Sequence, residues 1–318
     1  MHVPIPYLFQ GPPAKAQAWL TQLARAMPAE TIVTLDQLSD GQRAQVELAI
    51  VANPDPLELK TLPKLKWVHS LWAGVERLVA DLHDSPLTIV RLVDPQLAAT
   101  MAEAVLAWTL YLHRDMPTYA RQQAARLWQA HTYVRPEHKT VGVLGFGLLG
   151  QAAAQKLLGV GFQVCAWRRS GAVLDASLNP VTVFSGTDGL CEVLRRSNIL
   201  ICLLPLTPET QGLLDAKHLA SLPEGAALIN FARGPIVANA ALLAALDSGA
   251  MSHAVLDVFE QEPLPVDSPL WAHPKVTVLP HISGPTDLET GAQIVAQNIA
   301  LYRASGLIPA GVDRIKGY

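Results

Sequence analysis

Apolar residues along the chain fall into short, nearly unbroken runs, and the stretches between these runs show the helical spacing of apolar positions. A strand buried on both faces of a sheet is continuously apolar, and strands that alternate with helices are typical of a parallel sheet with crossover helices. In the first part of the chain the pattern predicts strands at residues 31–35, 48–52, 67–71 and 87–92, and helices at 14–26 and 75–81.

Prolines add two expectations for this first part. Pro4 and Pro6 stand where a first strand would lie, and proline cannot donate a ladder hydrogen bond, so we expect any strand there at a sheet edge. A long helical pattern covers about residues 100–128 and contains Pro117, where the helix should kink or divide. This helix is the expected hinge between a first and a second domain.

From residue 140 onward the apolar runs recur with helical segments between them. Such a series describes a second sheet buried on both faces, so the predicted fold class is α/β with two doubly wound parallel-sheet domains. A last helix is expected over residues 287–305. The predicted strands of the second sheet are residues 141–144, 162–167, 199–203, 227–230, 254–257 and 276–279.

The sequence TVGVLGFGLLG at residues 140–150 places glycines at Gly145, Gly147 and Gly150. In a dinucleotide-binding turn with this spacing, the first glycine makes the tight turn, the second lets the backbone approach a pyrophosphate, and the third lets the helix pack on the strand. A helix expected over residues 148–158 would direct its free N–H groups at the phosphates. Glycine-rich turns also serve structural ends, but the strand before and the helix after favour dinucleotide binding.

Three ionisable residues follow successive strands of the second sheet: Arg233 in NFARGP, Glu262 in DVFEQEPLP and His281 in LPHISG. This set suits carbonyl reduction, because a histidine can protonate the oxygen while a carboxylate raises its pKa and orients the ring. The arginine can hold a substrate carboxylate in a forked pair and polarise the carbonyl. Taken singly, the three could instead be a structural histidine, a turn residue and a helix-end cap.

Length and composition narrow the function classes. A chain of 318 residues with 50% hydrophobic and 16% charged residues fits two domains with large cores. Its net charge of −3 gives no indication of a basic surface that would bind nucleic acid or an anionic membrane. We find no signal peptide and no apolar run long enough to span a bilayer. Cys165, Cys191 and Cys202 lie in apolar segments without metal-ligand spacing, so we expect buried, reduced thiols, no metal and a cytoplasmic protein.

Several further motifs, in order along the chain, resemble those of the D-isomer-specific 2-hydroxyacid dehydrogenases. The likeness covers nearly the whole chain and is nearest to the glyoxylate/hydroxypyruvate reductase A branch of that family, which the C-terminal VDRIKGY also favours. Besides the glycine motif, the matching segments are SLWAGVERL at 70–78, TMAEAVLAWTL at 100–110, LLPLTPETQGLL at 203–214, LINFARGPIV at 228–237, LDVFEQEPLP at 256–265, SPLWAHP at 268–274 and LPHISG at 279–284.

The resemblance implies a domain plan and a reaction. Residues 101–286 would form the Rossmann dinucleotide-binding domain, and residues 1–100 with 287–318 a flavodoxin-like substrate domain to which the last helix returns. Members are usually homodimers. The implied reaction is NADPH-dependent reduction of small 2-oxo acids, glyoxylate to glycolate and hydroxypyruvate to glycerate. Alternatives on the same fold are a reductase for a bulkier 2-oxo acid and a corepressor-like protein that senses a dinucleotide; the intact catalytic set disfavours the second.

The resemblance also assigns residue roles. Arg233, Glu262 and His281 would be the substrate-binding, pKa-tuning and acid–base residues, and the Ala73–Gly74 backbone would bind the substrate carboxylate. Trp72, where the family usually carries a small residue, could narrow the pocket or simply pack under this loop. Asp257 would contact the nicotinamide end. The full implied cofactor set is Gly145, Gly147, Leu148, Leu149, Gly150, Trp167, Arg168, Arg169, Ser170, Leu204, Pro205, Thr210, Ala232, Asp257 and Ser283.

The end of the second strand of this domain bears on the choice of dinucleotide. NAD-selective sites carry an acidic residue there that binds the ribose 2′-hydroxyl. Here the strand ends in Trp167, Arg168, Arg169 and Ser170, with no acid until Asp175. Two guanidinium groups and a hydroxyl can bind a 2′-phosphate by charge-assisted hydrogen bonds, so we predict NADPH, with NADH less favoured. The alternative is that an arginine merely solvates the strand end.

Overall fold

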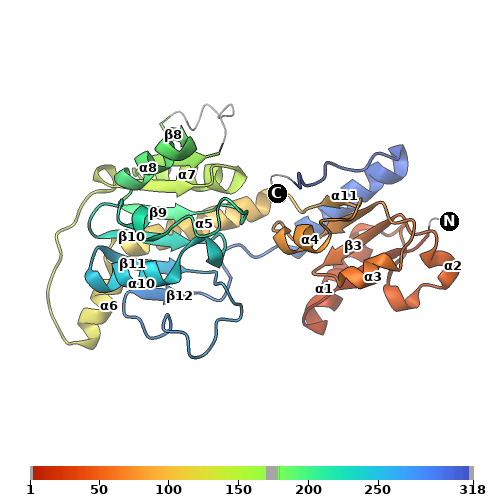
Figure 1. Cartoon of the computed structure of the whole chain (residues 1–318), viewed down its shortest axis with the longest axis horizontal. Helices are drawn as coiled ribbons and strands as arrows, with labels where there is room; N and C mark the ends of the chain where they lie inside the picture. Colours follow the sequence, from red (N-terminus) through yellow and green to blue (C-terminus); the bar gives the residue numbers. More distant parts are fainter. Residues whose placement is uncertain (1–2, 170–177, 179, 315–318) are drawn as a thin grey trace. The chain divides into compact units, whose positions relative to one another are not determined.

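The computed structural model describes residues 3–169, 178 and 180–314, which form two compact units (Figure 1). Unit 1 consists of Met1–Gln96 with Thr286–Tyr318, and unit 2 is the continuous segment Leu97–Pro285. All strand pairs in both units are parallel among the described residues. The structure thus confirms the predicted α/β class with two parallel sheets.

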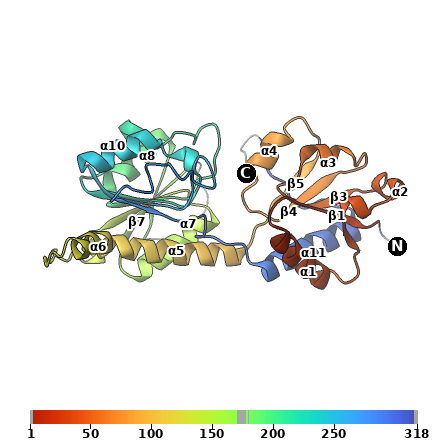
Figure 2. The same ribbon diagram turned by 90° about the horizontal axis from the view of Figure 1, so that it is seen from below.

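Unit 1 is built on a five-stranded sheet of order β2-β1-β3-β4-β5, which is the flavodoxin-like order. Helices α1 and α11 cover one face, and α3 and α4 lie on the other (Figure 2). The strands are β1 (Ile5–Phe9), β2 (Ile32–Thr34), β3 (Leu48–Ala52), β4 (Trp67–Ser70) and β5 (Thr88–Val90); the helices are α1 (Pro13–Ala26), α2 (Asp40–Arg43), α3 (Pro56–Lys60), α4 (Glu76–Asp81) and α11 (Leu288–Ser305), with a 3-10 turn at Leu35–Gln37.

The expectation of an edge position for the first strand is wrong, because β1 lies between β2 and β3. Its pairing with β2 runs from Ile5 to Tyr7, whereas its pairing with β3 begins only at Tyr7. Pro6 therefore lies just before the pairing with β3 begins. No hydrogen bond to β3 is needed at this position, so the missing N–H of proline costs nothing there. A proline at the start of a strand is compatible with a central strand.

Unit 2 carries a seven-stranded sheet of order β12-β11-β10-β9-β6-β7-β8, the doubly wound Rossmann order extended by one strand. The sequence pattern missed β8, a short edge strand whose side chains are partly or fully exposed. The strands are β6 (Thr140–Leu144), β7 (Gln163–Arg168), β8 (Thr182–Ser185), β9 (Ile199–Cys202), β10 (Ala226–Asn230), β11 (Met251–Leu256) and β12 (Val276–Val278).

Helices cover both faces of the second sheet (Figure 2). The predicted long helix is divided near Pro117, as α5 ends at His113 and α6 begins at Met116 after Asp115, whose φ is 53°. The helices are α5 (Pro95–His113), α6 (Met116–Ala124), α7 (Leu148–Gly159), α8 (Gly186–Arg196), α9 (Ala216–Leu219) and α10 (Asn239–Ser248), with 3-10 turns at Pro136–His138 and Gly234–Ile236.

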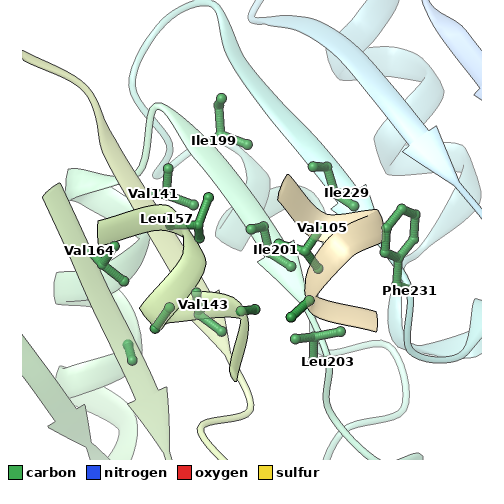
Figure 3. Packing of buried hydrophobic residues seen from close by; sticks show 14 of the residues in the cluster. Val105, Val141, Val143, Leu157, Val164, Ile199, Ile201, Leu203, Ile229 and Phe231 are labelled. Carbon is green, nitrogen blue, oxygen red and sulfur yellow. The ribbon is translucent and has the colours of Figure 1, made fainter. Parts of the chain in front are cut away.

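One core lies under α5 and α7, where Val105 and Leu157 pack on strand residues such as Val143 and Ile201 (Figure 3). A second core, on the opposite face, holds residues of α8, α9 and α10. Each fully buried aliphatic side chain contributes about 1.5–3 kcal/mol. Both faces of the sheet are therefore covered by packed helices, and the loops at the strand ends can carry polar groups.

Candidate active site

The glycine-rich turn connects β6 to α7 at the point where the strand order of unit 2 reverses. Gly145 has a φ of 97°, and a Cβ on it would lie 2.6 Å from the Leu203 carbonyl oxygen. A Cβ on Gly150 would lie 2.1 Å from the Gly145 carbonyl oxygen. Glycine is thus required at both positions, first by the left-handed backbone and then by the close approach of helix and turn.

Gly147 differs from the other two because no described atom lies within 4 Å of the Cβ it lacks. It is the N-cap residue of α7, and Leu148, the first helical residue, is 60% exposed while Leu149 packs partly on the core. The helix therefore begins at an open surface, with its unpaired N–H groups and positive dipole end available to a pyrophosphate. These residues fit a dinucleotide.

Three of the predicted cofactor-binding residues, Trp167, Arg168 and Arg169, lie at the end of β7. Trp167 donates its indole N–H to the Gly186 carbonyl oxygen at 2.8 Å, which fixes its ring beside β8. The Arg168 Nη1 atom is buried and hydrogen-bonds to none of the described residues, and Arg169 is exposed. A buried guanidinium nitrogen without a partner fits an anionic ligand. Ser170 lies outside the described residues.

The loop after β9 contains Leu204, Pro205 and Thr210. Leu204 is buried in the second core of unit 2. The Thr210 hydroxyl donates to the Pro205 carbonyl oxygen at 2.7 Å and accepts the Thr207 N–H at 2.8 Å. The Thr210 side chain therefore stabilises the loop to which it belongs. Hydrogen bonding to Thr207 lowers the pKa of the neighbouring Glu209, and the positive charge of Arg169 adds to this effect.

The loop after β10 carries Arg233. The Asn230 side chain, 1% exposed, accepts the Ala232 N–H and donates to the Arg233 carbonyl oxygen, both at 3.1 Å. The Arg233 guanidinium donates to the Ala232 carbonyl oxygen at 2.6 Å. A Cβ on Gly234 would lie 2.0 Å from the Phe259 carbonyl carbon, so glycine is needed for the loops after β10 and β11 to meet.

Glu262 and His281 form a hydrogen-bonded pair. The His281 Nδ1 atom lies 2.8 Å from Glu262 Oε2, and the other carboxylate oxygen accepts the Phe259 N–H at 3.0 Å. Because a carboxylate only accepts, Nδ1 carries the proton in this bond and Nε2 is left for chemistry. The side chains are 51% and 36% exposed for His281 and Glu262, so the pair is open to a ligand.

The pair shifts the pKa of both partners. The hydrogen bond to Glu262 raises the pKa of His281, against burial and the positive charge of Arg233, which lower it. Burial raises the pKa of Glu262, but the hydrogen bonds from His281 and from the Phe259 N–H outweigh it, so the pKa lies below its ordinary value. A protonated imidazole beside an ionised carboxylate is the form that a general acid needs.

Asp257 and Ser283 complete the predicted set at this edge. Asp257 is 2% exposed, and its two carboxylate oxygens accept the Ile282 N–H at 2.8 Å and the Ser283 N–H at 2.9 Å. The Ser283 hydroxyl is buried and has no hydrogen-bond partner in the described part of the chain. Asp257 thus holds the backbone just after His281, a contact that sequence reasoning missed.

In unit 1, the segment after β4 holds Trp72, Ala73 and Gly74. The Trp72 ring lies edge-on to Phe9 and Trp19, with centroids 6.2 and 6.1 Å away, and Lys15 Nζ lies 4.9 Å from its centroid. The ring thus packs against β1 and α1, which favours the packing alternative. Its effect on substrate size stays a prediction, as does carboxylate binding by Ala73 and Gly74.

The expectation of buried, reduced cysteines is confirmed for two of the three residues. All are free thiols; Cys165 and Cys202 are buried, but Cys191, on α8, is partly exposed. No group of three or more histidine, cysteine or acidic residues among the described positions could hold a metal ion. In the same part of the chain, no helix combines the length and apolarity needed to cross a membrane.

Solved structures of other proteins resemble the whole chain. A D-isomer specific 2-hydroxyacid dehydrogenase from Xanthobacter autotrophicus Py2, in complex with NADPH and MES, is 39% identical over 99% of this chain and 100% of that one, with a TM-score of 0.90. The NADPH-dependent glyoxylate/hydroxypyruvate reductase of Sinorhizobium meliloti, in complex with NADP and sulfate, is 31% identical over 100% of both chains, with a TM-score of 0.89.

A family protein from Klebsiella pneumoniae 342 is 31% identical over 98% of both chains, with a TM-score of 0.87. The family profile described as D-isomer specific 2-hydroxyacid dehydrogenase, NAD binding domain, matches residues 106–283, which fall within unit 2. The strand orders, the glycine-rich turn, the family profile and the full-length structural matches all indicate the same family. The chain belongs to the family of D-isomer specific 2-hydroxyacid dehydrogenases.

Proposed function

We propose that this dehydrogenase reduces small 2-oxo acids with NADPH, converting glyoxylate to glycolate and hydroxypyruvate to glycerate. The observation that carries the proposal is the hydrogen-bonded His281–Glu262 pair, with a Nδ1–Oε2 distance of 2.8 Å and the charge of Arg233 acting on both partners. A general acid, the carboxylate that tunes it and a cation for the substrate are thus gathered on adjoining loops.

The residues divide the work of carbonyl reduction. When bound, the nicotinamide supplies the hydride that the carbonyl carbon receives. His281 gives the proton on Nε2 to the carbonyl oxygen, and Glu262 keeps the ring oriented through Nδ1. Arg233 pairs with the substrate carboxylate, which orients the carbonyl toward His281. Hydride and proton together convert the C=O group into a CH–OH group.

The end of β7 supports NADPH as the hydride donor. The buried Arg168 Nη1 atom without a described partner and the exposed Arg169 offer two positive charges, where an NAD-selective strand would carry an acid. Two similar proteins, 39% and 31% identical, were solved with NADPH or NADP bound. A 2′-phosphate would complete the hydrogen bonding of Arg168.

The proposal of small substrates is supported by one comparison. In unit 1 we expect the backbone of Ala73 and Gly74 to bind the substrate carboxylate, next to Trp72, whose ring packs on Phe9 and Trp19. The Sinorhizobium meliloti protein, which is 31% identical over the full length, is a glyoxylate/hydroxypyruvate reductase. This similarity favours a 2-oxo acid with a hydrogen atom or a hydroxymethyl group beside the carbonyl.

We also propose a homodimer in the reducing environment of the cytoplasm. The free thiols of the chain suit that environment. A surface for a second copy is offered by α6 and the segment after it, where large apolar side chains gather and Trp128 is 100% exposed. The exposed apolar residues there are Met116, Tyr119, Leu127, Trp128, Tyr133 and Val134.

Initial rates of NADPH oxidation over a panel of 2-oxo acids test the proposal. Glyoxylate and hydroxypyruvate should give the highest kcat/KM, pyruvate and phenylpyruvate lower values, and an aldehyde without a carboxylate almost none. NADH in place of NADPH should reduce kcat/KM by about tenfold or more, equivalent to ~1.4 kcal/mol. A preference for phenylpyruvate would refute the proposed substrate class, and absence of turnover on every acid would refute the proposed activity.

A further inference from the structure

Two buried polar side chains stand at the carboxyl ends of neighbouring strands in unit 2. Asn230 is the last residue of β10, and Asp257 directly follows β11. The Asp257 N–H donates to the Asn230 carbonyl oxygen at 3.1 Å, so the two residues are adjacent in the sheet. Their exposures are 1% and 2%. Buried polar groups need partners, and both residues find theirs in loop backbone.

Asn230 holds the loop that presents Arg233. Its carbonyl oxygen accepts the Ala232 N–H and its amide donates to the Arg233 carbonyl oxygen, so both kinds of amide function are used. Aspartate would lack the donor for the second bond, and alanine would leave both backbone groups without partners. The peptide group before Ala232 and the peptide group after Arg233 are thereby fixed, and the Arg233 Cα atom lies between them.

Asp257 holds the loop that presents His281. Its two oxygens accept the N–H groups of the two residues that follow His281. His281 has a φ of 54°, in the left-handed region that is unfavourable for a residue with a side chain, and such a conformation persists only where its surroundings hold it. A carboxylate suits this place because it only accepts; asparagine would turn an NH₂ group toward one of the two N–H groups.

We propose that Asn230 and Asp257 are separate positioning residues, Asn230 for substrate binding through Arg233 and Asp257 for proton transfer through His281, an assignment that rests on the proposed function. Arg233 pairs with the substrate carboxylate in both the ground state and the transition state, so its displacement raises KM. His281 acts only as the proton moves, so its displacement lowers kcat. Neighbouring side chains of similar burial thus control different kinetic constants.

Charged groups around His281 give Asp257 a second measurable effect. Glu262, Arg233 and Asp257 all act on the imidazole, the two carboxylates raising its pKa and the arginine lowering it. Replacing Asp257 with asparagine removes one of the negative charges that raise the pKa of His281. The pKa of His281 should therefore fall in this variant, while Asn230→Ala should leave it unchanged.

Asn198 provides a matched control at the amino ends of the strands of the same sheet. It directly precedes β9, and its side-chain oxygen accepts the Thr140 N–H, at the start of β6, at 2.9 Å. Asn198→Ala thus removes a comparable hydrogen bond between a side chain and the backbone. This bond lies at the amino ends of the strands, whereas the catalytic loops follow the carboxyl ends. It should lower Tm by a similar amount and leave kcat, KM and the pKa of His281 unchanged.

Steady-state kinetics with glyoxylate and NADPH make the first measurement. We expect Asn230→Ala to raise KM by about tenfold and to keep kcat within about threefold of the wild-type value. We expect Asp257→Asn to lower kcat by about tenfold and to change KM by a smaller factor than kcat. A loss shared equally by kcat and KM in both variants would overturn the assignment. An effect of Asn198→Ala as large as theirs would do the same.

Two further measurements, one of ligand binding and one of a pKa, do not depend on turnover. Oxalate titrated calorimetrically into the NADP-bound protein should bind about tenfold more weakly to Asn230→Ala and almost normally to Asp257→Asn. NMR titration should show the pKa of His281 lowered only in Asp257→Asn. If wild type failed to reduce any 2-oxo acid, the proposed function would fail, while these two readouts would still decide for or against separate positioning roles.

Discussion

Glu262→Gln replaces the carboxylate beside His281 with a neutral group of the same size, so it isolates the charge. In the wild-type protein the carboxylate oxygen lies 2.8 Å from Nδ1 and raises the pKa of His281. Without that charge the imidazolium is less stable and its pKa falls. Reduction needs the protonated ring, so the rate is full below this pKa and is lost as pH rises through it. The variant should lose activity at a lower pH.

The size of the shift follows from exposure. Two unit charges ~4 Å apart interact with about 1 kcal/mol in water and about 4 kcal/mol at an effective dielectric constant near 20. The side chains of His281 and Glu262 are 51% and 36% exposed, so solvent screens the pair and the smaller figure applies. With ~1.4 kcal/mol for each pH unit, the midpoint should move down by about one unit.

The assay is kcat/KM for glyoxylate with NADPH from about pH 5 to pH 9 at constant ionic strength. Oxidation of glycolate with NADP needs the neutral ring, so its rising limb should move to lower pH by the same amount. His281→Ala serves as the reference and should be about 10²–10⁴-fold slower without this titration. An unshifted midpoint in Glu262→Gln would falsify the assignment of Glu262 as the residue that tunes His281.

Arg233→Lys should raise KM for glyoxylate by about tenfold or more, because a point charge cannot reproduce the forked pairing with a carboxylate; an unchanged KM would contradict the pairing. Arg168→Asp with Arg169→Ala should remove most of the NADPH preference, and an undiminished ratio of NADPH to NADH efficiency would place the 2′-phosphate elsewhere. Burial lowers the pKa of His69 to about 4, below that of the unfolded chain, so the stability it contributes is present above pH ~6.5 and about 2 kcal/mol is lost by pH ~5. His69→Gln should flatten the fall of Tm over this interval; an equal slope in both proteins would show that other groups cause it.

Hydrophobic runs predicted most of the fold because parallel strands buried on both faces leave a continuous apolar signal. β3, with all five residues buried, was predicted with its observed bounds, Leu48–Ala52. β8 gave no such signal because its side chains are partly or fully exposed at the sheet edge. The central position of β1 depends on the register of its two neighbours, which no single stretch of sequence encodes.

For the candidate site, the motifs indicated individual residues but not the contacts that hold them. Motif spacing indicated Arg233, Glu262 and His281, and the structure places the last two in direct contact, 19 residues apart in sequence. The roles of Thr210, within its own loop, and of Asp257, toward the residues after His281, were not foreseen. Such contacts join a side chain to backbone N–H and C=O groups, which every residue carries, so no residue type marks the partner.

The return of α11 to unit 1 sets an order of events during synthesis. Val295 and Ile299 of this helix are buried in the same core as Trp19 and Leu23 of α1, so that core is complete only when nearly the whole chain exists. Unit 2, a continuous segment, can fold as soon as it has left the ribosome. Until α11 is made, this face of the N-terminal sheet is therefore covered by α1 alone. We expect the apolar residues that α11 later covers to stay accessible to chaperones and proteases while the rest of the chain is translated.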